Sequence, residues 1–167
     1  MPATRADLMA RLAELGIAAR TVEHPAVFTV AESELLERDI PGGHTKNLFL
    51  KDAKERLFLV IAESHTQVDL KALPKLIGSA RLSFGKPELL EEVLGVTPGS
   101  VTTFALINDR ARRVTVIVDK RLEAFDTLNA HPLENTATTN VARADLFRFI
   151  RACGHEPRVV ALDGNSA

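Results

Sequence analysis

Three short segments place small, polar or basic residues directly beside stretches that should form buried strands. They are GGHTKN at residues 42–47, GVTPGSV at 95–101 and AHPLENTAT at 130–138. Lys46 adds a cation just before an apolar run. Glycine in the second segment lets a ligand approach backbone N–H groups closely, and such groups stabilise a developing oxyanion. Each segment taken singly is also explained as a turn, a helix end or a solvated lysine, so none of them defines a site alone.

The common catalytic signatures are absent from the chain. The GxGxxG, phosphate-loop and GxSxG patterns do not occur, which argues against dinucleotide enzymes, nucleoside triphosphatases and common serine hydrolases. The five histidines do not pair at metal-ligand spacing, so we expect neither a metal nor another cofactor. Cys153 is the single cysteine and excludes an internal disulfide. It lies at the C-terminal end of a predicted helix, where the helix dipole disfavours a nucleophilic thiolate.

Composition indicates an ordinary globular protein. The chain has 167 residues, 46% of them hydrophobic, and a formal net charge of −1. This length favours one domain over residues 1–167. The balanced charge argues against a general nucleic-acid coating protein, since a nucleic acid would have to be held by a local patch. The N-terminus does not resemble a signal peptide and no apolar run is long enough to cross a bilayer, so we expect a cytoplasmic protein without a membrane partner.

Local signals predict the helices that frame the three segments. Thr4 with Asp7 resembles a capping box, and apolar residues at helical spacing then predict a first helix that Gly16 ends. A second helix should begin after a capping residue at Thr29 and end at Pro41. Further helices are expected over residues 69–77, 86–95 and 143–153.

Apolar runs around polar turns predict two hairpins. NLFLKD and LFLVIAE, at residues 47–52 and 57–63, should pair, and the second run is apolar enough to be buried on both faces. VTTFALI and RRVTVIV, at 101–107 and 112–118, should pair across an Asn-Asp turn. Single strands are expected in SARLSFG and PRVVAL. Strands outnumber helices and gather in hairpins, which predicts an α+β fold with a mixed, largely antiparallel sheet flanked by helices.

Together, the three segments resemble the YbaK-like family of free-standing aminoacyl-tRNA deacylases, which is related to the editing insertion domain of bacterial prolyl-tRNA synthetase. In that family a lysine ahead of a strand, a GxxPG-type loop and a late HP element line one pocket. This chain supplies Lys46, GVTPG at 95–99 and His131-Pro132. The resemblance extends from HPAVFTV at residue 24 to the closing helix. The run KNLFLKD and the N-terminal helix look most similar to the branch that removes alanine mischarged onto proline tRNA.

The resemblance implies hydrolysis of the ester between an amino acid and the terminal adenosine of tRNA, on a barrel-like α+β fold. It implies catalytic roles for Lys46, Gly99, Ser100 and His131, and substrate contacts from His44, Thr45, Asn47, Gly95, Pro98 and Asn135. Lysine suits the terminal nucleotide, and the N–H groups of the Gly-Ser pair suit a carbonyl oxygen that gains charge. An aminoacyl ester is already activated, so a strong protein base is not required, which accounts for the missing triad.

The implied partners are mischarged tRNA and, as a further candidate, prolyl-tRNA synthetase, with a monomer and a homodimer both open. A deacylase of the same fold that acts on cysteine or serine carried by tRNA is one alternative. A non-catalytic module that grips tRNA ends or another nucleic acid is a second. A small-molecule-binding regulator is a third, which no feature beyond a pocket supports.

Overall fold

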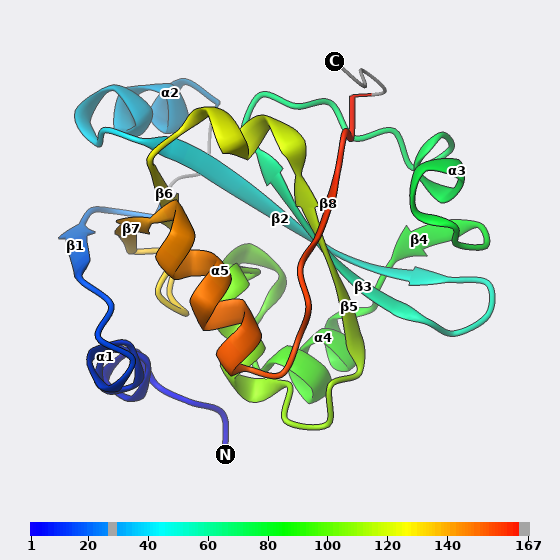
Figure 1. Cartoon of the computed structure of the whole chain (residues 1–167), viewed down its shortest axis with the longest axis horizontal. Coiled ribbons are helices and arrows are strands. Elements are labelled where there is room, and N and C mark those ends of the chain that lie inside the picture. The colour runs from blue at the N-terminus through cyan, green and yellow to red at the C-terminus, as the bar shows by residue number, and fades with distance from the viewer. Residues whose placement is uncertain (27–29, 164–167) are drawn as a thin grey trace.

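Eight strands form a mixed sheet in the computed structural model, which describes residues 1–26 and 30–163 (Figure 1). The strands are β1 (Ala19–Glu23), β2 (Gly43–Asp52), β3 (Leu57–Glu63), β4 (Leu82–Phe84), β5 (Val114–Asp119), β6 (Thr127–Ala130), β7 (Ala137–Ala142) and β8 (Arg158–Val160). Their order is β1-β7-β6-β2-β3-β5-β8, and β4 also pairs with β2. The β1/β7, β6/β7, β2/β3 and β2/β4 pairs are antiparallel, whereas β2/β6, β3/β5 and β5/β8 are parallel. The expected mixed α+β architecture is confirmed, although the pairings among the described residues leave the path open and do not close a barrel.

Helices surround this sheet and connect its strands. They are α1 (Arg5–Glu14), α2 (Val30–Asp39), α3 (Leu73–Ile77), α4 (Pro87–Leu94) and α5 (Arg143–Ala152), with short 3-10 helices η1 (Pro98–Ser100), η2 (Thr103–Asn108) and η3 (Lys120–Ala124). Figure 1 shows α2 beside the end of the sheet where β2 begins, and α5 near β6 and β7. No helix within residues 1–26 and 30–163 combines the length and apolarity that crossing a membrane requires.

The helix ends follow the local signals in the sequence. Thr4 and Asp7 form the predicted capping box, in which each side chain accepts the other's backbone N–H. Leu8 then packs in the core. Gly95 ends α4 with a φ of 66°, a conformation that favours glycine. The capping residue expected at Thr29 lies outside the described residues.

The core lies on both sides of β3, as its apolar sequence predicted. All seven residues of this strand are buried. Alternate side chains enter two clusters, one that contains Leu59 and Ile61 and a smaller one that contains Phe58 and Val60. A strand that is packed on both faces is held firmly in place, and it positions the strands that pair with it. One of these is β2, which carries the first of the three polar segments.

The structure differs from the sequence predictions at three places. Strand β2 begins at Gly43, so most of the segment 42–47 is strand and not a loop. The run 101–107 is not a strand, because the Thr102 hydroxyl accepts the Phe104 N–H and starts the 3-10 helix η2. The expected second hairpin is therefore wrong, and β5 pairs in parallel with β3 and β8. Helix α3 covers only the last part of the predicted span, since the Asp69 carboxylate accepts the Lys71 N–H in a preceding turn.

Candidate functional site

A cavity of ≈ 380 Å³ lies where the start of β2, η1 and the turn after β6 meet. Its volume is near the lower end of the roughly 300–1,000 Å³ that is typical of small-molecule sites. Seven residues selected from sequence line it together: His44, Thr45, Lys46, Asn47, Pro98, Gly99 and His131. The three polar segments, far apart in the chain, therefore contribute to one concave surface.

Three other selected residues are not part of this lining. Gly95 lies at the C-terminal end of α4 and borders a separate hollow beside Pro2. Asn135 lies near the cavity, because its amide nitrogen would be 3.6 Å from a Cβ added at Gly99. Ser100 follows the cavity-lining glycine in η1. The glycine that begins the GxxPG-type loop thus ends a helix, and only the second half of that loop reaches the cavity.

Two buried threonine hydroxyls tie the three segments together. The Thr103 hydroxyl donates to the Asn47 side-chain oxygen at 2.9 Å, which joins η2 to β2. The Thr102 hydroxyl donates to the His131 carbonyl oxygen at 2.6 Å, which joins the same loop to the turn after β6. Both threonines are fully buried. Both threonines belong to the run 101–107 that was predicted to be a strand, and their hydroxyls connect the walls of the cavity.

The start of β2 is fixed by a buried asparagine. The Asn129 amide nitrogen donates to the Pro41 carbonyl oxygen at 3.0 Å, and its side-chain oxygen accepts from the Asn140 amide at 3.0 Å. The Asn129 carbonyl oxygen accepts the Thr45 hydroxyl at 2.7 Å. These bonds connect β2 with β6 and β7, so the lysine that follows Thr45 is presented from an anchored backbone.

Lys46 is half-buried in the cavity wall and has no carboxylate within ion-pair distance among the described residues. Lys51, on the same strand, instead pairs with Glu55 at 3.4 Å. An ammonium group is strongly hydrated, and it is costly to hold one in a concave site without an anionic partner. The cation is therefore available to a negatively charged ligand.

The two amides expected to hold an oxyanion differ in their hydrogen bonds. The Ser100 N–H donates to the Thr97 carbonyl oxygen at 2.9 Å, so it is already occupied. The Gly99 N–H has no acceptor within the described part of the chain. The expectation that both amides hold a developing oxyanion is thus corrected: the 3-10 turn uses one of them internally and leaves the other exposed.

His131 is held as a neutral imidazole with a defined tautomer. Its Nδ1 lies 3.0 Å from the Ala137 carbonyl oxygen, and a carbonyl only accepts, so Nδ1 carries the proton. Burial lowers the pKa of His131 below its ordinary value, the Ala137 carbonyl opposes this effect, and the nearby His24 adds to the lowering. The Nε2 lone pair of His131 can therefore accept a hydrogen bond from water or substrate at neutral pH.

His44 uses its other ring nitrogen. Its Nε2 lies 2.8 Å from the Ile40 carbonyl oxygen, so Nε2 donates, and Nδ1 has no hydrogen-bond partner within the described residues. His65 is exposed and lies outside the lining. Cys153 is half-buried at the C-terminal end of α5, and burial raises the pKa of its thiol to about 11. This agrees with the prediction that the cysteine is not a nucleophile.

The lining includes several residues that the sequence analysis did not select: Ser33, Leu36, Glu37, Ser64, Val101, Asn129, Ala130 and Thr138. The first three lie on one face of α2, at a spacing of three and four residues, and that spacing was a usable signal. Thr138 is buried in β7, and its hydroxyl lies 2.8 Å from Nε2 of His24. The position of Ser64 depends on a turn that the sequence does not mark.

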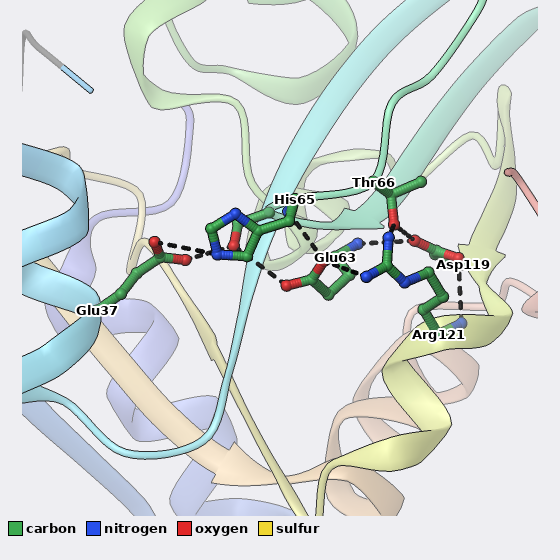
Figure 2. Close-up of polar contacts among 7 residues, drawn as sticks. Glu37, Glu63, His65, Thr66, Asp119 and Arg121 are labelled. Atoms are coloured by element: carbon green, nitrogen blue, oxygen red, sulfur yellow. Dashed lines mark hydrogen bonds and ion pairs between the residues drawn. The ribbon is translucent and has the colours of Figure 1, made fainter. Parts of the chain in front are cut away.

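The turn after β3 borders the cavity and is held by a buried carboxylate. Asp119 accepts the Glu63 N–H at 3.0 Å and the Thr66 hydroxyl at 2.6 Å. The Arg121 guanidinium donates to the Thr66 hydroxyl at 3.1 Å and lies 3.7 Å from the Glu63 carboxylate. Figure 2 shows these contacts, which start at Arg121. They end at the cavity, where the hydroxyl of Ser64, the residue after Glu63, donates to the Glu37 carboxylate. Within residues 1–26 and 30–163, no cluster of acidic, histidine or cysteine residues has metal-binding geometry.

Comparison with known proteins places the geometry in context. The family model described as "Aminoacyl-tRNA editing domain" matches residues 24–149. The chain is 36% identical over 156 residues to the prolyl-tRNA editing protein ProX of Acetoanaerobium sticklandii, covering 93% of this chain and 95% of that protein. It is 37% identical over 161 residues to prolyl-tRNA synthetase associated domain-containing protein 1 of Danio rerio, covering 95% and 88%. A solved structure described as a candidate trans-editing enzyme for prolyl tRNA synthetase has the same fold, with a TM-score of 0.69, 18% identity and coverage of 96% and 98%.

Proposed function

The chain belongs to the aminoacyl-tRNA editing domain family, and we propose that it is a trans-editing deacylase that hydrolyses alanine mischarged onto proline tRNA. The family membership supports hydrolysis of the ester between an amino acid and the terminal ribose of tRNA. The relatives named for prolyl-tRNA editing support proline tRNA as the carrier. The enzyme would act in the cytoplasm on free mischarged tRNA, and prolyl-tRNA synthetase is a candidate partner.

One observation carries the proposal: Lys46, Gly99 and His131 line the same cavity. These residues supply a cation, a free backbone N–H and a neutral imidazole. An aminoacylated tRNA end has a phosphate, a carbonyl that becomes an oxyanion, and a water that must attack it. Each chemical need of the reaction thus has one matching group in the wall.

In the proposed reaction, Lys46 binds phosphate or polar groups of the terminal nucleotide and so positions the ester. Water attacks the acyl carbon, and the Gly99 N–H donates to the oxygen that becomes negatively charged. His131 orients the water through Nε2. The bond between the acyl carbon and the ribose oxygen then breaks, and the ribose oxygen takes the proton that the attacking water gives up. An activated ester does not need a strong protein base, so assistance from the neighbouring ribose hydroxyl can be sufficient.

Selection for alanine would follow from size. A synthetase pocket shaped for proline rejects a smaller amino acid weakly, because a missing methylene is worth only about 1–3 kcal/mol. A second, smaller pocket can remove alanine and exclude proline. Leu36, Val101 and Ala130 are apolar side chains in the lining and are the candidates for this steric limit.

A deacylation panel tests the proposal. Purified protein is mixed with the same proline tRNA carrying alanine, cysteine, serine or proline, and amino acid release is timed. We expect alanine release to be fastest and proline to remain attached. Faster release of cysteine or serine would reassign the substrate, and saturable binding without release would favour a binding module.

Variants on strand β2 provide a matched comparison for this panel. Lys46→Ala should reduce alanine release by more than a hundredfold, because substrate loses its cationic contact. Lys51 lies on the same strand as Lys46, is half-buried and pairs with Glu55 in the turn that follows, so Lys51→Ala should leave the rate unchanged. Equal rates for the two variants would remove Lys46 from the mechanism.

A further inference from the structure

The cavity wall contains one carboxylate as well as one ammonium group. Among the described lining residues, Glu37 is the only acidic side chain and Lys46 the only lysine or arginine. They come from α2 and β2, and they do not pair with each other in the described part of the chain. Two opposite charges that share a small cavity without cancelling each other suit a ligand that carries both signs.

Glu37 is held in place at the cavity wall. The Ser64 hydroxyl donates to one carboxylate oxygen, and His65 lies 3.6 Å from the other. Ser64 is itself fixed, because its N–H donates to the His44 carbonyl oxygen at 2.8 Å. The Glu37 side chain is only 18% exposed, whereas the His65 side chain is 65% exposed. An ion pair with so exposed a histidine is worth little, so the Glu37 charge is not neutralised by it.

An aminoacylated tRNA end carries charges of both signs. The terminal phosphate is negative, and the α-amino group of the amino acid is a cation when protonated. The ester lies between the two. If Lys46 holds the nucleotide, the aminoacyl end extends to another part of the same cavity. A fixed, mostly buried carboxylate there favours an ammonium ligand, because within residues 1–26 and 30–163 no lysine or arginine pairs with it and its histidine contact is exposed.

We propose that Glu37 binds the α-ammonium group of the aminoacyl ester and makes the enzyme selective for acyl groups that carry one. This inference rests on the proposed deacylase function and adds the part of the substrate that Glu37 recognises. Glu37 does not act as the base for water in this scheme. A base would act on any ester, whereas a carboxylate that binds the ammonium group distinguishes substrates by their charge.

The test compares two esters on the same proline tRNA. One carries alanine. The other carries lactate, which has a hydroxyl group where alanine has the ammonium group and is otherwise of similar size. Wild-type protein should cleave the alanyl ester with a kcat/KM about tenfold to a hundredfold above that for the lactyl ester, as expected for one charge-assisted hydrogen bond. Glu37→Gln keeps the shape and an acceptor for Ser64, and it should cleave both esters at similar rates.

Glu34→Gln is the matched control, since Glu34 is exposed on the same helix and outside the cavity lining. It should keep the wild-type preference. The ratio of the two rates is measured on one preparation, so it does not depend on the fraction of active protein. A Glu37→Gln variant that loses the same factor on both esters, or that keeps the preference for alanine, overturns the inference while wild-type deacylation still stands. Wild-type protein that cleaves neither ester refutes the proposed function, and the inference with it.

Discussion

Replacement of Thr103 by valine should remove a hydrogen bond at the site without creating a cavity in the core. Valine has nearly the same shape but lacks the hydroxyl that donates to Asn47 at 2.9 Å. The Asn47 oxygen then loses its buried donor, and Thr103 itself is fully buried. Leaving such a group unsatisfied costs about 1–3 kcal/mol. For a chain of this length, that loss lowers the midpoint of thermal unfolding by several degrees.

The same substitution should slow deacylation because this hydrogen bond joins η2 to the strand that carries Lys46. A small displacement of a positioned group can cost up to about a hundredfold in rate. We expect kcat/KM for the alanyl ester to fall at least tenfold in Thr103→Val. The free energy of unfolding is measured by denaturant titration, and the rate by release of alanine.

Thr103→Ser is the control, since it keeps the hydroxyl and removes only a methyl group. It should retain most of the activity and lose less stability than the valine variant. The reasoning is wrong if valine is tolerated in both assays. It is also wrong if serine is as damaging as valine in the rate assay, because packing and not the hydrogen bond would then control the site.

Three further predictions follow from the geometry. Burial lowers the pKa of His131, so its neutral form persists somewhat below the ordinary histidine range; kcat/KM should be level at neutral pH and fall only when acid protonates this ring, as a pH–rate profile will show. Gly99→Ala should fold normally, because an added Cβ meets nothing closer than 3.6 Å, but its kcat/KM should fall about tenfold because the methyl group hinders approach to the free N–H. Gly95→Ala should keep its activity and lower the unfolding free energy by about 1–2 kcal/mol, because the φ of Gly95 is 66° and an added Cβ would lie 2.8 Å from Asn108. Burial would raise the pKa of Asp52, but hydrogen bonds from neighbouring N–H groups outweigh this effect and lower the pKa to about 2. The stability that Asp52 contributes should therefore be present above about pH 4 and disappear as the pH falls through about 2. Denaturant titrations across this range should show that the difference in unfolding free energy between wild type and Asp52→Asn shrinks as the pH falls.

Signals within a few residues of one another were sufficient to predict most elements. The capping box at Thr4, the glycine at the end of α4 and the apolar sequence of β3 each act over a few residues, and the structure contains all three features. The run 101–107 was assigned wrongly because β-branched and apolar residues before a turn are typical of a strand. Its conformation is decided instead by the Thr102 cap and by a hydrogen bond from Thr103 to a residue 56 positions away.

The cavity was predictable in outline and not in detail. Lys46, Gly99 and His131 could be selected because their residue types fit a known pattern, and all three line the cavity. The spacing of Ser33, Leu36 and Glu37 on one face of α2 was visible in the sequence, but the role proposed for Glu37 was not, because the Ser64 hydroxyl that holds its carboxylate comes from the turn after β3. The occupied N–H of Ser100 was equally invisible, since it depends on the exact turn that the backbone adopts.

The most direct test is a crystal structure of the protein with a non-hydrolysable amide analogue of alanyl-adenosine 5′-monophosphate. The analogue should lie in the cavity with its carbonyl oxygen roughly 2.7–3.1 Å from the Gly99 nitrogen, its phosphate at Lys46 and its ammonium group at Glu37. An analogue bound elsewhere, or one whose carbonyl points away from Gly99, would contradict the assignment of this cavity as the site of ester hydrolysis.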